Sequence, residues 1–347
     1  MEDGQLGVAV IGLGYWGINQ VRVFHELPQV NLIAICDQRE ERMKEVAERF
    51  PYVEGYTDFK KMLERDDIDA VVISTNATTH FDIAGPCLKA GKHVLLEKPM
   101  TTIVDEAGQL IKLAEENNVT FMVGHTFLFN VAVQKVKNLL TQPDTGDIYY
   151  MYSRRTNLGP IRQDVNAVWD LAPHDISVFN YFMDAVPEWV SVVGSQVLKS
   201  GLEDVAFIAL GYPRDVIAHI HVSWADPNKV RETTVVCSNR RIVFDDLNAL
   251  EPVRVFDKGV ASVAAEEAAS FGEYRLQIRD GDILSPRIQI SEPLKNLATH
   301  FVNCVVTNKK PLSDGVNGFD VVRVLEAIDR SLAKKGAPVT LSPAYSK

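Results

Sequence analysis

Three glycines near the start of the chain have the spacing of a dinucleotide-binding turn. Gly12, Gly14 and Gly17 follow an apolar run, LGVAVI, and open a pattern typical of a helix. In this motif the first glycine permits a tight turn, the second lets the backbone approach a diphosphate, and the third lets helix pack on strand. The helix N-terminus then offers backbone N–H groups and a partial positive charge to the diphosphate.

Asp37 ends the next apolar run, about 20 residues after the last glycine, where a carboxylate can accept hydrogen bonds from the adenine ribose hydroxyls. A carboxylate there favours NAD, because it would repel the 2′-phosphate of NADP. The neighbouring Arg39 leaves use of both cofactors open. Alternatively, Asp37 only caps a helix that begins near Arg39. We expect NAD, with NADP as the less favoured cofactor.

Two later segments carry residue types suited to oxidising a hydroxyl group. GKHVLLEKP ends in Lys98 and Pro99, and WDLAPHD places Asp170 and His174 four residues apart, on one side of a helical turn. Imidazole titrates near neutral pH and can accept the hydroxyl proton, whereas an ammonium can stabilise the developing alkoxide. The alternatives are a surface lysine before a proline, an Asp170 N-cap and a solvated His174.

Together with Ser74-Thr75-Asn76 and His80, these motifs resemble those of the glucose-fructose oxidoreductase, inositol dehydrogenase and rhizopine-catabolism (Gfo/Idh/MocA) family, from Gly7 to about Val339. The resemblance implies hydride transfer between NAD and a sugar hydroxyl, with Lys98, Asp170 and His174 as catalytic residues. Either Lys98 or His174 would be the base. The cofactor-binding residues expected on these grounds are Gly12, Gly14, Tyr15, Trp16, Gly17, Asp37, Gln38, Thr75, Asn76, His80, Glu97 and Lys98.

The segment 154–162 is basic and is expected to form a loop facing the substrate. The forked side chains of Arg154, Arg155 and Arg162 suit phosphate or carboxylate oxygens, or alternatively a solvated loop or a subunit contact. With residues 168–175, the segment is similar to nucleotide-sugar members of the family. This similarity implies oxidation at the C3 hydroxyl of a nucleotide sugar such as UDP-N-acetylglucosamine. The expected substrate-binding residues are Lys98, Asn157, Arg162, Asp170 and His174.

Two other functions remain open at this point. One is a free-sugar or inositol dehydrogenase. The other is a non-catalytic regulatory protein that binds NAD, although such a protein would have no need of Lys98, Asp170 and His174 together.

The elements that must position these residues change character along the chain. In the first third, apolar runs alternate with helical patterns, which predicts an α/β Rossmann domain with a parallel, doubly wound sheet over residues 1–126. Closely spaced alternating strands then predict an α+β domain over residues 127–347, with a large, open, mainly antiparallel sheet for substrate binding and oligomerisation. Within it, we expect Pro173 in the first turn of a helix and a loop or insertion over 259–275.

One face of the second sheet is expected to be apolar and to be buried against another protein surface. Alternating apolar residues would form that open face, which predicts a homo-oligomer, either a dimer or a tetramer. The residues expected there are Val205, Phe207, Ile208, Ile217, Ile220, Val222 and Trp224.

Composition fits a small-molecule enzyme. The 347 residues suffice for two domains, and 36 Lys and Arg against 46 Asp and Glu give a formal net charge of −10, which offers no attraction to nucleic acid or an anionic membrane. The acidic start does not look like a signal peptide and no apolar run is long enough to cross a bilayer, so we expect a cytoplasmic protein. Four separated cysteines without a C-x-x-C pair and eight histidines without an H-E-x-x-H helix predict no metal site.

Overall fold

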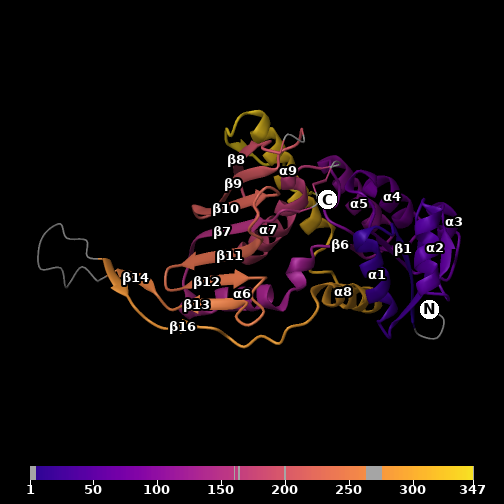
Figure 1. Cartoon of the computed structure of the whole chain (residues 1–347), viewed down its shortest axis with the longest axis horizontal. Helices are drawn as coiled ribbons and strands as arrows, with labels where there is room; N and C mark the ends of the chain where they lie inside the picture. Colours follow the sequence, from indigo (N-terminus) through magenta and orange to yellow (C-terminus); the bar gives the residue numbers. More distant parts are fainter. Residues whose placement is uncertain (1–4, 160, 163–164, 199–200, 263–275, 347) are drawn as a thin grey trace, which may run out of the picture. The chain divides into compact units, whose positions relative to one another are not determined.

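The computed structural model describes the chain except for residues 1–4, 160, 163–164, 199–200, 263–275 and 347. By packing, it divides into two compact units (Figure 1). The first unit contains Met1–Phe129, Ser291–Glu326 and Ser342–Lys347, and the second contains Asn130–Ile290 and Ala327–Leu341. The chain thus leaves the first unit after residue 129 and returns at residue 291, whereas the sequence suggested a single boundary after residue 126.

The first unit is built on a six-stranded parallel sheet in the order β3-β2-β1-β4-β5-β6. This order is that of the doubly wound Rossmann fold, so the predicted α/β class is confirmed. Its strands are β1 (Leu6–Ile11), β2 (Val30–Cys36), β3 (Glu54–Tyr56), β4 (Ala70–Ile73), β5 (His93–Leu96) and β6 (Phe121–Val123).

Helices cover both faces of this sheet, which is why β1 is an unbroken apolar run with every residue buried. Helix α1 packs against α8 and α4 packs against α5, and Figure 1 shows these pairs on opposite sides of the strands. The helices are α1 (Tyr15–His25), α2 (Glu40–Arg49), α3 (Phe59–Leu63), η2 (Ala77–Thr79), α4 (His80–Lys89), α5 (Val104–Glu116), η3 (Thr126–Phe129) and α8 (Pro293–Thr307).

The second unit is built on a nine-stranded sheet in the order β16-β13-β12-β11-β7-β10-β9-β8-β17. Strands β7 and β10 run parallel and the other neighbouring pairs run antiparallel, which confirms the predicted mainly antiparallel sheet. The strands are β7 (Ile148–Thr156), β8 (Trp189–Ser195), β9 (Val205–Tyr212), β10 (Val216–Ser223), β11 (Val230–Cys237), β12 (Arg241–Asp245), β13 (Val253–Phe256), β16 (Ile283–Leu284) and β17 (Val339–Thr340).

Two helices, α6 (Val131–Leu140) and α7 (Ala167–Met183), contact each other and pack on this sheet. The short η4 (Pro143–Thr145) follows α6, and α9 (Gly315–Ala333) continues from the first unit into the second. Helix α9 ends at Ala333, and shortly after it Gly336, with a φ of 92°, donates its N–H to the Ser331 carbonyl and so terminates the helix.

Two expectations about the second unit were wrong in detail. Helix α7 begins at Ala167, capped by the Asn166 side chain, so Pro173 lies inside the helix and not in its first turn. Residues 259–262, expected in a loop, form β14 (Gly259–Ser262), which pairs with β15 (Leu276–Arg279). The rest of that expected loop, 263–275, lies outside the described residues.

The apolar face was also assigned wrongly. Side chains alternate between the two faces of a strand, so Phe207 and Ile208 cannot share a face. Phe207 and Ile217 are exposed, at 44% and 51%, and Val205 is half-buried. The remaining four residues are buried on the face that α7 covers, namely Ile208, Ile220, Val222 and Trp224.

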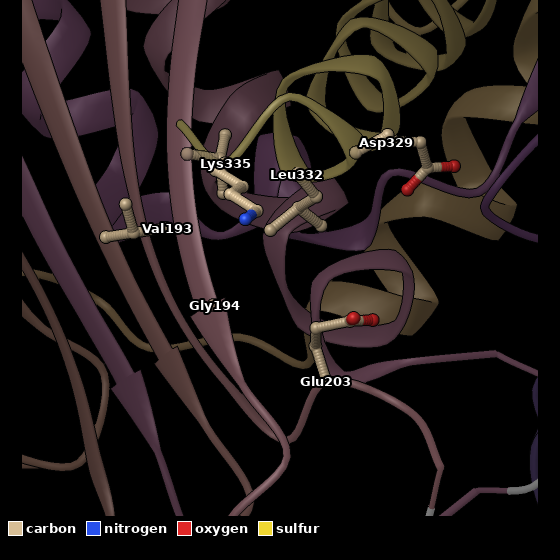
Figure 2. Close-up of a pocket in the computed structure, with 8 residues that line it drawn as sticks. Val193, Gly194, Glu203, Asp329, Leu332 and Lys335 are labelled. Atoms are coloured by element: carbon tan, nitrogen blue, oxygen red, sulfur yellow. The ribbon is translucent and has the colours of Figure 1, made fainter. Parts of the chain in front are cut away.

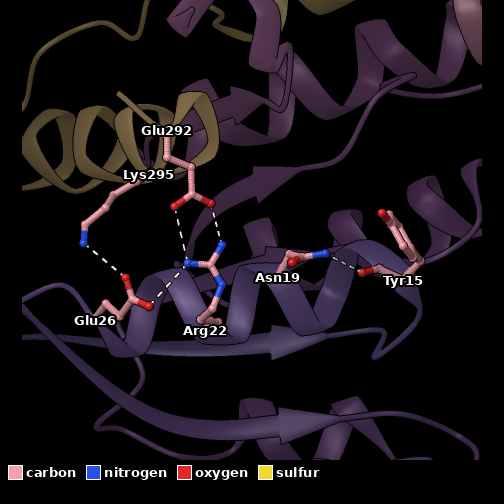
Figure 3. A network of polar contacts seen from close by, with 6 residues as sticks. All are labelled: Tyr15, Asn19, Arg22, Glu26, Glu292 and Lys295. Atoms are coloured by element: carbon pink, nitrogen blue, oxygen red, sulfur yellow. Dashed lines mark hydrogen bonds and ion pairs between the residues drawn. The ribbon is translucent and has the colours of Figure 1, made fainter. Parts of the chain in front are cut away.

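Helix α8, from late in the chain, joins the first unit by packing on α1. Phe24 and Phe301 are fully buried and meet edge to face, with ring centroids 6.4 Å apart. At the surface of the same contact, Arg22 donates to Glu292 and Glu26, and Lys295 donates to Glu26 (Figure 3). Apolar burial therefore carries most of the energy of this contact, since exposed ion pairs contribute little.

We expect Phe301→Ala to lower the free energy of unfolding by about 3–5 kcal/mol, because it leaves a cavity beside Phe24. Arg22→Ala should cost less than about 1 kcal/mol, because the lost ion pairs are exposed. Urea unfolding of the two variants without cofactor measures both values, and equal losses would contradict the assignment of the α1–α8 contact to apolar packing.

Candidate active site

A cavity of about 920 Å³ lies in the first unit at the carboxyl ends of β1, β2 and β4. The strand order reverses between β1 and β4, which is where open α/β sheets bind nucleotides. Its lining residues are Ile11, Gly12, Gly14, Cys36, Asp37, Gln38, Arg39, Thr57, Asp58, Phe59, Lys60, Ser74, Thr75, Asn76, Thr79, Asp82 and Ile83.

The glycine turn at this cavity fits a diphosphate. Gly12 has a φ of 87°, and a Cβ there would lie 2.8 Å from the Ser74 carbonyl carbon. A Cβ on Gly17 would lie 1.8 Å from the Gly12 oxygen, so the start of α1 packs on the turn backbone. Around Gly14 the space is open, and no side chain caps α1 there. The N–H groups of the first turn of α1 are therefore available to an anion.

Asp37 is held at the cavity wall by two neighbours, Leu13 and Arg39. Its carboxylate accepts the Leu13 N–H at 2.8 Å, the Arg39 N–H at 2.9 Å and the Arg39 guanidinium at 3.0 Å. Burial alone would raise the pKa of Asp37, but the hydrogen bonds from Arg39 and Leu13 outweigh it and lower the pKa. Asp37 is thus an anion at neutral pH, with Arg39 lying against it.

The cavity brings together only part of the predicted cofactor set. Gly12, Gly14, Asp37, Gln38, Thr75 and Asn76 line it. Tyr15 and Trp16 lie in the first turn of α1 with their rings exposed. Gly17 does not line the cavity, but its lack of a side chain lets this turn pack on Gly12. His80, Glu97 and Lys98 are not among the lining residues.

Lys98 follows β5 at the same edge of the sheet, in a turn held by its neighbour Glu97. The Glu97 carboxylate accepts the Lys98 N–H at 3.2 Å and the Gln20 amide at 2.9 Å. Burial raises the pKa of Glu97, and the bond from Gln20 and the charge of Lys98 partly offset that effect. The backbone of Lys98 is therefore fixed from the side of α1.

Two buried histidines lie around this turn. His80, the first residue of α4, is 1% exposed, with Nδ1 at 2.9 Å from the Pro99 oxygen and Nε2 at 3.2 Å from the Thr75 oxygen. His125 is fully buried, and burial followed by the charge of Lys98 lowers its pKa to about 3. His125 is therefore neutral at physiological pH.

In the second unit, buried polar contacts fix the first turn of α7. The Asn166 side chain accepts the Trp169 N–H at 3.0 Å and donates to Glu203 at 3.1 Å, while the Trp169 indole donates to Asp329 at 2.9 Å. Glu203 and Asp329 also line a pocket of about 530 Å³ beside β8, together with Leu332 and Lys335 (Figure 2). These carboxylates anchor the turn that carries Asp170.

Asp170 and His174 stand one turn apart on α7, as the spacing predicted. One carboxylate oxygen of Asp170 accepts from Arg162 at 3.2 Å, and the other lies 3.4 Å from the Trp224 indole nitrogen. His174 is half-buried. The pair thus places a carboxyl group, held by Arg162 and Trp224, one helical turn from an imidazole.

The expected arginine loop does not form as predicted. Arg154 and Arg155 belong to strand β7, and Arg154 is exposed opposite His221 and Glu232. Arg155 is buried in a two-point ion pair with Asp175, at 2.7 and 3.2 Å. Asn157 and Arg162 follow β7, and Arg162 is paired with Asp170.

Several residues at these sites were missed by sequence reasoning. Phe59 and Lys60 line the cavity, and no sequence signal pointed to either of them. Trp224 was counted as apolar cover, so its indole donor was overlooked. Asp329 accepts a hydrogen bond from Trp169, which is 160 residues away in sequence, and no local pattern identifies such a distant contact.

Within the described residues, no group of three or more His, Cys, Asp or Glu side chains is arranged to hold a metal ion. In that same part of the chain, no helix is long and apolar enough to span a membrane. All four cysteines are buried and free.

Comparison with known proteins finds relatives along nearly the whole chain. A 4-carboxy-2-hydroxymuconate-6-semialdehyde dehydrogenase of Sphingobium sp. (strain NBRC 103272 / SYK-6) is 29% identical, covering 95% of this chain and 99% of that protein. A UDP-N-acetylglucosamine 3-dehydrogenase of Acidithiobacillus ferrooxidans is 25% identical over 89% of this chain and 91% of that protein. The crystal structure of GenD2 from gentamicin A biosynthesis, in complex with NAD, has the same fold, with a TM-score of 0.82, 23% identity and coverage of 99% and 98%.

Two family models match consecutive parts of the chain. Residues 6–125 match the oxidoreductase family with an NAD-binding Rossmann fold, and residues 133–243 match the GFO/IDH/MocA C-terminal domain. The chain therefore belongs to the GFO/IDH/MocA family of oxidoreductases, and its N-terminal part is the NAD-binding Rossmann domain of that family.

Proposed function

We propose that this protein transfers hydride between NAD and a secondary hydroxyl group of a sugar. The observation that carries the proposal is a glycine-lined dinucleotide cavity with a lysine fixed at the same edge of the sheet. Lys98 follows β5, directly beside β4, whose end lines the cavity. NAD, when bound, would supply the hydride acceptor, and the side chains would handle the proton and the charge.

Lys98 would donate a hydrogen bond to the substrate oxygen and stabilise its negative charge as the proton leaves. His174 would take that proton, since an imidazole exchanges protons near neutral pH. Asp170 would orient the substrate hydroxyl or the imidazole, because Arg162 and Trp224 hold its carboxylate in place. In the alternative assignment, Lys98 itself accepts the proton.

For the substrate, we propose a nucleotide sugar oxidised at C3, with UDP-N-acetylglucosamine as the first compound to test. Support comes from the Acidithiobacillus relative and from Asn157 and Arg162, which lie near Asp170 in sequence. The Arg162–Asp170 pair is partly exposed, so the guanidinium can also contact a substrate anion.

A free sugar or inositol is the second candidate. The observation that favours it is that two of the arginines expected to bind a phosphate are not available at the expected loop. Arg155 is committed to Asp175, and Arg154 lies on the opposite face of β7.

The function is tested by a panel of UDP-sugars, dTDP-sugars, free hexoses, inositols and a hydroxymuconate semialdehyde, each with NAD. Turnover is measured as the absorbance of the reduced cofactor. We expect the highest kcat/KM with UDP-N-acetylglucosamine. Turnover of hexoses or inositols alone would replace the nucleotide-sugar assignment. NAD binding without turnover of any compound would favour a regulatory protein.

In the same assay, Lys98→Met and His174→Gln should each lower kcat by at least about 100-fold, because each removes a proton-transfer or charge-stabilising group. The Kd for NAD should change by less than about threefold, a change of well under 1 kcal/mol. Lys92→Met, which removes another lysine near β5, is the matched control. Rates like the wild type in both catalytic variants would refute the assignment.

Cofactor preference should depend on Asp37. In Asp37→Ser the carboxylate that repels a 2′-phosphate is gone and the Arg39 guanidinium is released from its ion pair. We expect kcat/KM with NAD to fall roughly 10-fold and that with NADP to rise, since a hydrogen bond to a charged group is worth about 1.5–3 kcal/mol. An unchanged NAD to NADP ratio would show that Asp37 does not contact the ribose.

We also propose that the open sheet face packs against a second copy of the chain. Phe207 and Ile217 are exposed there, and Phe207 stacks on His221 with ring centroids 4.4 Å apart. Phe207→Glu should therefore produce monomers in sedimentation at micromolar concentration, whereas Tyr52→Glu, at an exposed aromatic residue of the first unit, should not. A monomeric wild type would contradict the proposal.

A further inference from the structure

Both ring nitrogens of His80, a predicted cofactor residue, lie within hydrogen-bond distance of backbone carbonyls. Its ring lies between two loops of the first unit, with Nδ1 2.9 Å from the Pro99 oxygen and Nε2 3.2 Å from the Thr75 oxygen. At 1% exposure the ring is shielded from solvent. The ring is therefore held by the backbone of both loops.

The two carbonyls belong to functionally different loops. Thr75 follows β4 and lines the nucleotide cavity, whereas Pro99 follows Lys98 after β5. In an open parallel sheet, the loops at the carboxyl ends of neighbouring strands hold the ligand between them. The imidazole of His80 therefore spans the distance between the cavity wall and the lysine turn.

The lysine turn is held from two directions. Glu97 accepts the Lys98 N–H, which fixes the turn before Lys98, and His80 contacts the carbonyl directly after it. Without His80, the Pro99 carbonyl would lose its buried partner, and an unsatisfied buried carbonyl drives local rearrangement. A shift of about 1 Å in a catalytic group can cost on the order of 100-fold in rate.

We propose that His80 is a positioning residue that sets Lys98 relative to the nucleotide cavity through the Pro99 carbonyl. This inference rests on the proposed role of Lys98. The Nδ1 contact with the Pro99 oxygen, at 2.9 Å, is shorter than the Nε2 contact with the Thr75 oxygen, at 3.2 Å, so we assign the positioning role to the hydrogen bond from Nδ1–H to Pro99.

Two conservative substitutions separate the contacts. In Asn, the amide nitrogen takes the place of Nδ1 and can still donate to Pro99. In Gln, the longer side chain places its amide near Nε2 and can donate to Thr75 instead. Ala removes both contacts. His93→Ala is the matched control, because the His93 Nδ1 accepts the Thr120 N–H at the opposite end of β5.

We expect kcat to fall between about 10-fold and 100-fold in His80→Ala and His80→Gln, and to stay within threefold of the wild type in His80→Asn and His93→Ala. The Kd for NAD should change little in all four variants. Equal losses in the Asn and Ala variants, or a loss confined to NAD binding, would overturn the proposal.

Hydrogen exchange gives a readout that needs no turnover. Exchange of the amides in residues 97–103 should accelerate in His80→Ala relative to the wild type and remain slow in His80→Asn, at similar thermal stability. Unchanged exchange in His80→Ala would refute the positioning role even if Lys98 is catalytic. If exchange accelerates in His80→Ala but the wild-type protein turns over none of the compounds tested, the positioning role of His80 is retained and the proposed function is rejected.

Discussion

The first unit depends on one steric constraint, the close approach of the start of α1 to the glycine turn. The Gly12 oxygen lies so near Gly17 that no side chain fits between them, and Gly12 itself adopts a φ that other residues rarely tolerate. This approach leaves the N-terminus of α1 uncapped at the reversal of strand order. The same geometry that allows helix and strand to pack also creates the anion site, so packing and cofactor binding cannot be changed independently.

In the second unit, buried polar contacts hold the helix that carries Asp170 and His174, the residues proposed for catalysis. Asn166, Trp169 and Asp175 are bonded to Glu203, Asp329 and Arg155, all outside α7, and Asp175 directly follows His174 in sequence. Removing one member of such a buried pair typically costs about 3–5 kcal/mol, because the other charge is left uncompensated. These contacts hold α7 rigidly on the sheet. The result is a helix on which Asp170 and His174, the proposed catalytic residues, are held in place by buried contacts of their neighbours.

The sequence was sufficient for the fold and for the cavity, because both follow from local patterns. Continuous apolar runs marked the buried strands, and glycine spacing with Asp37 marked the nucleotide turn. Prediction from the sequence was incomplete where contacts between residues distant in sequence determine the role of a side chain. Arg155 looked like a ligand for phosphate because its partner Asp175 is distant in sequence. No local pattern predicts the two backbone carbonyls that His80 contacts. The roles of Lys98, Asp170 and His174 remain predictions.

The discontinuity of the first unit has a consequence for how the chain is made. A ribosome releases residues 1–129 long before Pro293–Thr307, yet α8 supplies Phe301, which covers Phe24 on α1. During synthesis that apolar surface stays uncovered while the whole inserted unit emerges. A fragment ending after β6 would keep the nucleotide turn and still display a hydrophobic patch, which is a liability for solubility. Anyone wishing to excise the nucleotide-binding part should therefore graft the late helix onto it.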